Sequence, residues 1–211
     1  MKEKIIRVKE IWNEYELGFY VSVAGSFAMG TIHLVTTIIS FSWLTFNYML
    51  FCYIMMLARV YIWFLKRKDK QKYIYLAGAI ILLIVLIPLT VSLVKTIMDK
   101  DAPHYLFDWF IYAYALYAFY KLINGIIKLV KSKKTDDSFN NVISWLALVN
   151  ALFTMFMLEA TMIIIFAENA VSMQYLQLFM QGFIILFVVA IIVMFINRFI
   201  KQIKVNKVID F

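Results

Sequence analysis

The sequence predicts an all-α, polytopic integral membrane protein with six transmembrane helices and both termini in the cytoplasm. Hydrophobic residues make up 64% of the 211 residues and charged residues only 16%, whereas soluble domains are nearer half apolar and a quarter charged. Six stretches are each long enough to cross a bilayer, which takes roughly 20 apolar residues. The third observation is that lysines and arginines are concentrated in alternate loops.

The chain begins with a segment, residues 1–16, that mixes lysine with glutamate and lacks the cleavage site of a signal peptide. Its apolar residues recur at helical spacing: Ile5, Val8, Ile11, Trp12 and Tyr15. We therefore expect an amphipathic helix that lies on the cytoplasmic membrane surface. A six-helix transmembrane domain, residues 17–199, follows it, and a short basic cytoplasmic tail, residues 200–211, ends the chain.

The predicted spans cover residues 18–40, 42–65, 73–97, 104–128, 141–166 and 172–197. Only one or two residues join the first span to the second. The third span contains Pro88, which predicts a kink because proline removes a backbone hydrogen bond. The fourth is rich in aromatic residues, the fifth carries Glu159, and the sixth carries glutamines toward its outer end.

The orientation follows from the basic residues. Seventeen of the 21 lysines and arginines lie in the N-terminal arm, at the ends of the second and fourth spans with their loops, and in the tail. Such residues accumulate in cytoplasmic loops, so both termini are expected in the cytoplasm. The composition is rich in isoleucine, lysine, asparagine, tyrosine and phenylalanine, which suits an AT-rich bacterial genome. We therefore expect a bacterial cytoplasmic membrane protein.

Polar side chains inside the spans are the candidate functional residues, because ionisable groups at membrane depth are costly. A rise of about 1.5 Å per residue places most of them in the outer half of the membrane. This candidate pocket consists of Glu159, His33, Gln177, Gln181, Asp108, Tyr112 and Asn47. We therefore expect a polar pocket that opens toward the outside.

Glu159 is the leading residue of this candidate pocket. Its neighbours at three- and four-residue spacing on the fifth span are Met155, Phe156, Met162 and Ile163. In such apolar surroundings a carboxyl group is either protonated or paired. A structural hydrogen bond and a site for a ligand, cation or proton both stay open. His33 alone is more typical of an interior histidine than of a ligand.

A second group of polar residues is cationic and falls in the inner half of the membrane: Arg59, Lys121, Asn124 and Asn150. A lysine near a membrane interface commonly extends its side chain toward water. We therefore expect Lys121 to snorkel to the inner interface.

The first span also carries small residues at four-residue intervals, Ser22, Ser26 and Gly30. Small residues at this spacing let a second helix approach closely. That helix belongs either to the same bundle or to a second copy or partner subunit, so a homo-oligomer or a membrane partner stays open.

Enzymatic chemistry is not expected. The sequence has no HExxH, GxSxG or phosphate-binding glycine loop. A single cysteine excludes a disulfide framework and cysteine-based metal sites. We expect no metal and no cofactor. The basic loops lack a nucleic-acid-binding module, so the expected partners are the lipid bilayer and anionic lipid headgroups rather than nucleic acid.

Two functions remain. The first is a transport or binding component for a small solute, ion or proton, with the outward-facing polar pocket as its site. In size, helix number and its small-residue first span the chain resembles the substrate-binding subunits of energy-coupling-factor transporters, although its first two spans are joined by a shorter loop. The alternative is a non-catalytic subunit, assembly factor or sensor of a membrane complex.

Overall fold

The computed structural model describes residues 2–68, 70, 73–98, 110–133, 137–166 and 170–209, and within them the side chains of 19–39, 41–68, 70, 73–94, 111–133, 137–163 and 175–203. Six α-helices form this part of the chain: α1 (Lys2–Ser40), α2 (Trp43–Arg67), α3 (Ile74–Met98), α4 (Phe110–Ser132), α5 (Ser138–Phe166) and α6 (Ala170–Ile209). All six are long and apolar enough to cross a membrane. The prediction of an all-helical protein with six candidate spans is therefore confirmed.

Two helices extend beyond the predicted spans. Residues 2–16, expected as a separate surface helix, are the first turns of the uninterrupted helix α1, and α6 continues through most of the expected tail to Ile209. Whether residues 1–16 lie on a membrane surface stays a prediction. Pro88 lies inside α3, which continues past it to Met98.

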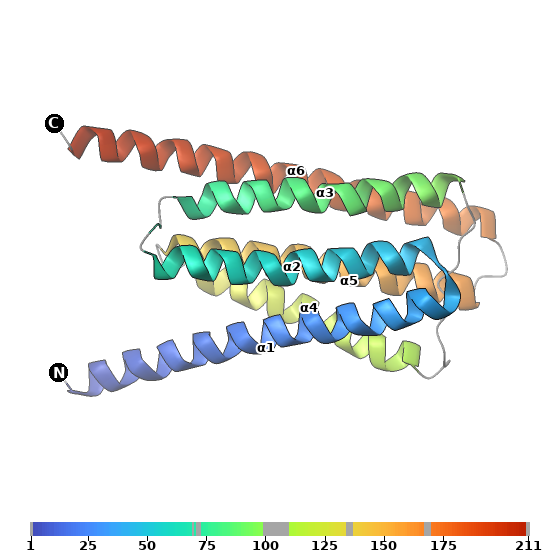
Figure 1. Cartoon of the computed structure of the whole chain (residues 1–211), viewed down its shortest axis with the longest axis horizontal. Coiled ribbons are helices and arrows are strands. Elements are labelled where there is room, and N and C mark those ends of the chain that lie inside the picture. Colours follow the sequence, from blue (N-terminus) through green and yellow to red (C-terminus); the bar gives the residue numbers. More distant parts are fainter. Residues whose placement is uncertain are drawn as a thin grey trace.

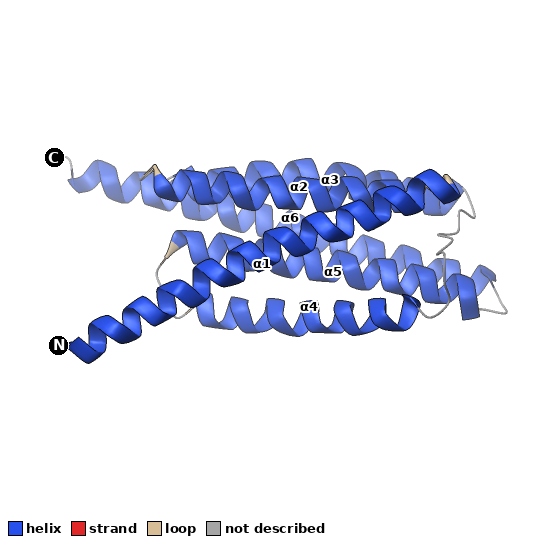
Figure 2. Cartoon of the chain, turned by 60° about the horizontal axis from the view of Figure 1, so that its bottom comes forward, coloured by secondary structure: helices blue, strands red, loops and turns tan. Residues whose placement is uncertain are grey.

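The helices run alternately up and down, so the two termini lie at the same end of the bundle (Figure 1). The closest pairs are α1 with α2, α3 with α6, and α4 with α5. Helix α2 also packs on α3 and α5, and α5 packs on α6. Helices α2 and α5 are therefore central, while α4 lies at one edge against α5 (Figure 2).

The connection between α1 and α2 consists of Phe41 and Ser42, as short as predicted. Phe41 has a φ of 52°, a left-handed conformation that is uncommon outside glycine. Its backbone N–H donates to Thr37 O at 2.8 Å, which closes the last turn of α1. A bond of 3.1 Å from Thr37 Oγ1 to Thr45 Oγ1 then ties the two helices together beside the turn.

Aromatic side chains fill the contact between the central helices. Phe51 of α2 and Phe153 of α5 are completely buried, and their ring centroids are 4.2 Å apart. Tyr48 and Phe156 extend this stack on either side. Helices in a membrane associate through such close packing and through interhelical hydrogen bonds, because lipid tails are as apolar as the side chains. The aromatic stack therefore packs together the helices that carry Arg59, Asn150 and Thr154.

Candidate functional site

The outer polar residues are divided among different helix pairs. Gln181 of α6 is buried, and its Nε2 donates to Ser92 Oγ of α3 at 2.7 Å. His33 of α1 is also buried, but its ring lies 4.3 Å from that of Tyr48 on α2 and 6.1 Å from that of Tyr114 on α4. The Gln181 bond joins α6 to α3, whereas the His33 contacts join α1 to α2 and α4. Gln181 and His33 therefore do not share the single outer pocket that their similar predicted depths suggested.

The other members of the candidate pocket have varied surroundings. Tyr112 is 66% exposed on α4 and so belongs to the outer surface of the bundle. Asn47 is buried and Gln177 is half-buried. Glu159 is half-buried, and its Oε2 is covered but has no hydrogen-bond partner in the part of the chain that the structure describes. Asp108 lies outside the described residues.

A connected polar network occupies the interior between α2, α4 and α5, and Thr154 of α5 is its centre. The Thr154 hydroxyl donates to Asn150 O at 2.7 Å. Since a hydroxyl has only one proton, the Thr154 oxygen must be the acceptor in its other hydrogen bonds. It therefore accepts from Lys121 Nζ at 3.1 Å and from Tyr48 Oη at 2.9 Å. Tyr114 Oη lies 3.5 Å from Thr154 O, which brings a fourth side chain to the same point.

Lys121 points into this network. Its ammonium donates to Asn150 Oδ1 and Thr154 Oγ1, each at 3.1 Å, and lies 4.9 Å from the centre of the Tyr117 ring. The expectation that Lys121 snorkels to the inner interface is therefore wrong. The reason is local: α5 offers two oxygens at the level of the ammonium, so the charge is solvated by protein at membrane depth. Asn124, one turn further along α4, is half-buried.

Arg59 is the second cation inside the bundle, and it is buried whereas Lys121 is half-buried. Only 2% of this α2 residue is exposed. Its Nη1 donates to Ser26 Oγ at 2.7 Å and to Ser22 O at 2.9 Å, so the guanidinium joins α2 to α1. Its Nε is buried and has no acceptor within the described part of the chain.

Every hydrogen-bond acceptor of these two cations is a neutral oxygen. Only two described side chains are acidic, Asp137 at the start of α5 and Glu159. Glu159 lies five positions beyond Thr154, which turns it about 140° away around the helix. Among the described residues, therefore, no carboxylate balances Arg59 or Lys121. Within the same residues, no three histidine, cysteine, aspartate or glutamate side chains gather as a metal site would require.

The small residues of α1 serve packing inside the chain. Gly30 lies against Tyr53 and Cys52 of α2, and a Cβ at Gly30 would approach the Tyr53 ring to 3.2 Å. Ser26 is buried and accepts the Arg59 bond. Of the two roles left open for Ser22, Ser26 and Gly30, the structure shows packing between α1 and α2. This face is therefore occupied by α2 of the same chain.

The sequence contained one signal for this site. The sequence predicts Arg59, Lys121 and Asn150 in the inner half of the membrane, but a predicted depth gives neither the rotation of a helix nor its neighbours. Thr154, Tyr48 and Ser26 were not connected with the cations, because threonine, tyrosine and serine are common in membrane helices.

Comparisons with protein-family models, curated proteins and solved structures found no match to this chain.

Proposed function

We propose that this protein binds a small anion inside a bacterial cytoplasmic membrane and moves it across, with Arg59 and Lys121 as the binding residues. The observation that carries the proposal is that both cations are held in membrane-spanning helices by neutral oxygens alone, within the described part of the chain. This refines the expectation of a transport or binding component: the ligand is negative, and its site lies between α1, α2, α4 and α5.

Electrostatics supports an anionic ligand. Removing one ion from water costs several kcal/mol in a protein interior, and an opposite charge is the usual compensation. Serine, threonine and asparagine oxygens stabilise a cation by their dipoles but leave its net charge in place. An anion bound to Arg59 and Lys121 would supply the opposite charge that both lack among the described residues.

The donors available at this point also suit an anion. The buried Nε of Arg59 and the buried Nδ2 of Asn150 both lack an acceptor among the described residues. Buried N–H groups are rarely left without partners, because each costs about 1–3 kcal/mol. Oxyanions such as phosphate and carboxylates have several acceptor oxygens that bind guanidinium and amide N–H groups.

The extent of the polar interior favours transport over simple storage. On α1 the polar residues continue from Ser22 through Ser26 to His33, which contacts Tyr48 and Tyr114 of the Thr154 network. Eleven residues of helix span about 16 Å, roughly half the hydrocarbon thickness. Polar side chains of these helices therefore occur at levels from the cations toward the opposite end of the bundle.

The test is anion-dependent thermal stability of the purified full-length protein. Sodium gluconate, chloride, nitrate and phosphate are compared at equal ionic strength, because a ligand that binds only the folded state raises Tm. We expect at least one of the three smaller anions to raise Tm relative to gluconate. The same anion should leave vesicles containing the protein faster than empty vesicles.

Matched variants make the result specific. Lys121→Met and Arg59→Gln should lose the anion-dependent rise in Tm. Lys131→Met removes an exposed lysine from the same helix as Lys121, and Glu159→Gln removes the carboxyl group of α5; both should keep the rise. If chloride, nitrate and phosphate all leave Tm at its gluconate value, or if Lys121→Met responds like the wild type, the proposal is wrong.

A further inference from the structure

A groove on the outer face of α6 forms a second basic site, separate from the cations between α1, α2, α4 and α5. It has a volume of about 350 Å³. Its described lining comes from α6 and recurs at helical spacing: Ala190, Val193, Met194, Asn197, Arg198 and Lys201. The groove is therefore apolar at one end and basic at the other.

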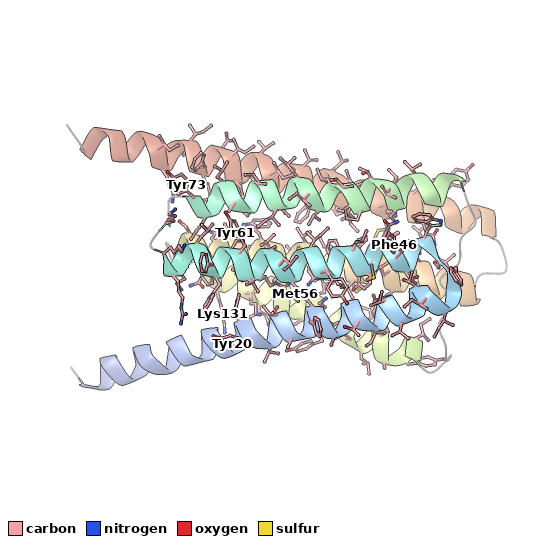
Figure 3. All side chains as sticks on the ribbon, in the orientation of Figure 1. Tyr20, Phe46, Met56, Tyr61, Tyr73 and Lys131 are labelled. Atoms are coloured by element: carbon pink, nitrogen blue, oxygen red, sulfur yellow. The ribbon has the colours of Figure 1, made fainter. Side chains whose placement is uncertain are left out.

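The basic end lies at the level of a membrane interface. The sixth span predicted from the sequence ends at residue 197, so Arg198 and Lys201 lie just beyond it, where the membrane interface is expected. Tyr73, 41% exposed, lies with its ring 6.5 Å from that of Phe199 at the same level. Figure 3 shows Tyr73 and Lys131 toward the end of the bundle that carries the termini. Exposed aromatic rings at this level are typical of the headgroup zone.

Arg198 is held in place rather than extended at random. Its Nη1 donates to Tyr75 Oη of α3 at 3.2 Å, and the guanidinium lies 5.6 Å from the centre of the Tyr75 ring. This bond uses one of the five N–H donors of an arginine. No acidic side chain is present among the described residues that line the groove. The site therefore presents an oriented guanidinium next to the ammonium of Lys201.

We propose that this groove binds one anionic phospholipid, with its phosphate on Arg198 and Lys201 and its acyl chains along α6. The distance from Lys201 to Ala190 is about 16 Å along the helix, about half of the hydrocarbon thickness, so the groove has the length of one acyl chain that runs to the membrane centre. Val189 and Leu186, which are apolar and exposed, continue the surface of α6 just beyond Ala190. A soluble phosphate would use the basic end only, so the apolar end favours a lipid.

The test is native mass spectrometry of the full-length protein titrated with dioleoylphosphatidylglycerol or with dioleoylphosphatidylcholine. We expect one phosphatidylglycerol molecule to bind more tightly than phosphatidylcholine. Lys201→Ala should weaken that binding about fivefold, because one basic residue near a membrane surface contributes about a factor of this size. Ala190→Phe should weaken it as well, since the larger side chain fills the apolar end without changing the charge.

Lys131→Ala is the matched control, because it removes one exposed lysine from α4 at the same end of the bundle. It should leave the binding unchanged. If it weakens binding as much as Lys201→Ala, the lipid is attracted only by net charge and the groove is not a site. Unchanged binding in Ala190→Phe, equal binding of the two lipids, or displacement of the lipid by free glycerol 3-phosphate would also overturn the proposal.

Discussion

Arg59 and Lys121 are solvated by different means. Arg59 uses the Ser26 hydroxyl and the Ser22 carbonyl of α1, whereas Lys121 uses the Asn150 and Thr154 side chains of α5. Each cation therefore holds one pair of helices together in addition to its proposed role. Substitution of a hydrogen-bond partner tests the contribution of each cation to helix packing, because the partner is changed while the charge that would bind an anion stays.

Ser26 and Ser22 provide such a comparison. Ser26→Ala removes the hydroxyl that accepts from Arg59 at 2.7 Å, so it should lower the free energy of unfolding by about 1–2 kcal/mol. Ser22→Ala keeps the backbone carbonyl that accepts the other bond and should have little effect. Thermal or denaturant unfolding of the two variants checks this. Equal stability of both would mean that the Ser26 bond contributes nothing.

The sequence predicted the residue types of the site but not its contacts. The length of each apolar stretch defines where a span begins and ends, and counting residues from those ends predicted a similar depth for Arg59, Lys121 and Asn150. The direction of the Lys121 side chain depends on Asn150 and Thr154, which are 29 and 33 positions away in the chain. Nothing in the local sequence of α4 reveals those acceptors, so the expectation of snorkelling was wrong for a reason outside the helix.

At the scale of elements, α3, α5 and α6 approach one another closely at Gly78. A Cβ at this position would lie 2.8 Å from Val142 Cγ1 and 2.9 Å from the Phe195 ring, so the Val142 and Phe195 side chains or the helices that carry them must shift. Overpacking of this kind costs about 1–3 kcal/mol. Gly78→Ala should therefore lower the thermal stability of the protein.

Gly182 of α6 is the control for this prediction. Among the described residues, no atom outside the adjoining backbone of α6 and the two chain neighbours lies within 4 Å of a Cβ built there, so Gly182→Ala meets no obstacle. Alanine is the better helix former by up to about 1 kcal/mol, and this variant should be neutral or more stable. A Gly78→Ala variant that unfolds at the wild-type temperature would contradict the packing of α3 against α5 and α6.

The helices were largely predictable, and their pairing largely was not. The ends of α2 and α3 fall within two residues of the predicted spans, since an apolar run is interrupted where charged loops begin. The short turn at Phe41 and Ser42 makes α1 and α2 neighbours. The pairing of α3 with α6 had no such signal, because these spans are apolar on nearly all sides. The sequence therefore does not distinguish the face that contacts lipid from the face that contacts another helix.

At the scale of the whole molecule, both termini lie at one end of the bundle (Figure 1). The exposed basic residues Lys68 and Lys131, at the ends of α2 and α4, belong to connections at the same end. The structure does not contain a membrane, so the cytoplasmic location of this end is a prediction from the distribution of basic residues.

Cysteine labelling of intact cells tests that orientation. Phe41, 87% exposed in the α1–α2 connection, lies at the end opposite to Lys131. A membrane-impermeant maleimide should label Phe41→Cys but reach Lys131→Cys only after the cells are opened. Native Cys52 is buried and should give little background. Labelling of Lys131→Cys alone in intact cells would reverse the orientation.

Arg59 and Lys121 lack a negative charge among the described residues, and we propose that an anion supplies it. The thermal stability of Asn150→Asp in gluconate buffer tests this proposal. Asn150 Oδ1 lies 3.1 Å from Lys121 Nζ, so aspartate would place a carboxylate beside the ammonium without a change of shape. Asn47→Asp is the control, because Asn47 is buried with no described contact to a cation and its carboxylate would stay unbalanced.

We predict that Asn150→Asp raises Tm above that of the wild type and abolishes the further rise caused by added anions, whereas Asn47→Asp lowers Tm. A fall in Tm for Asn150→Asp that matches the fall for Asn47→Asp would contradict the account, because it would mean that no uncompensated positive charge exists at Lys121.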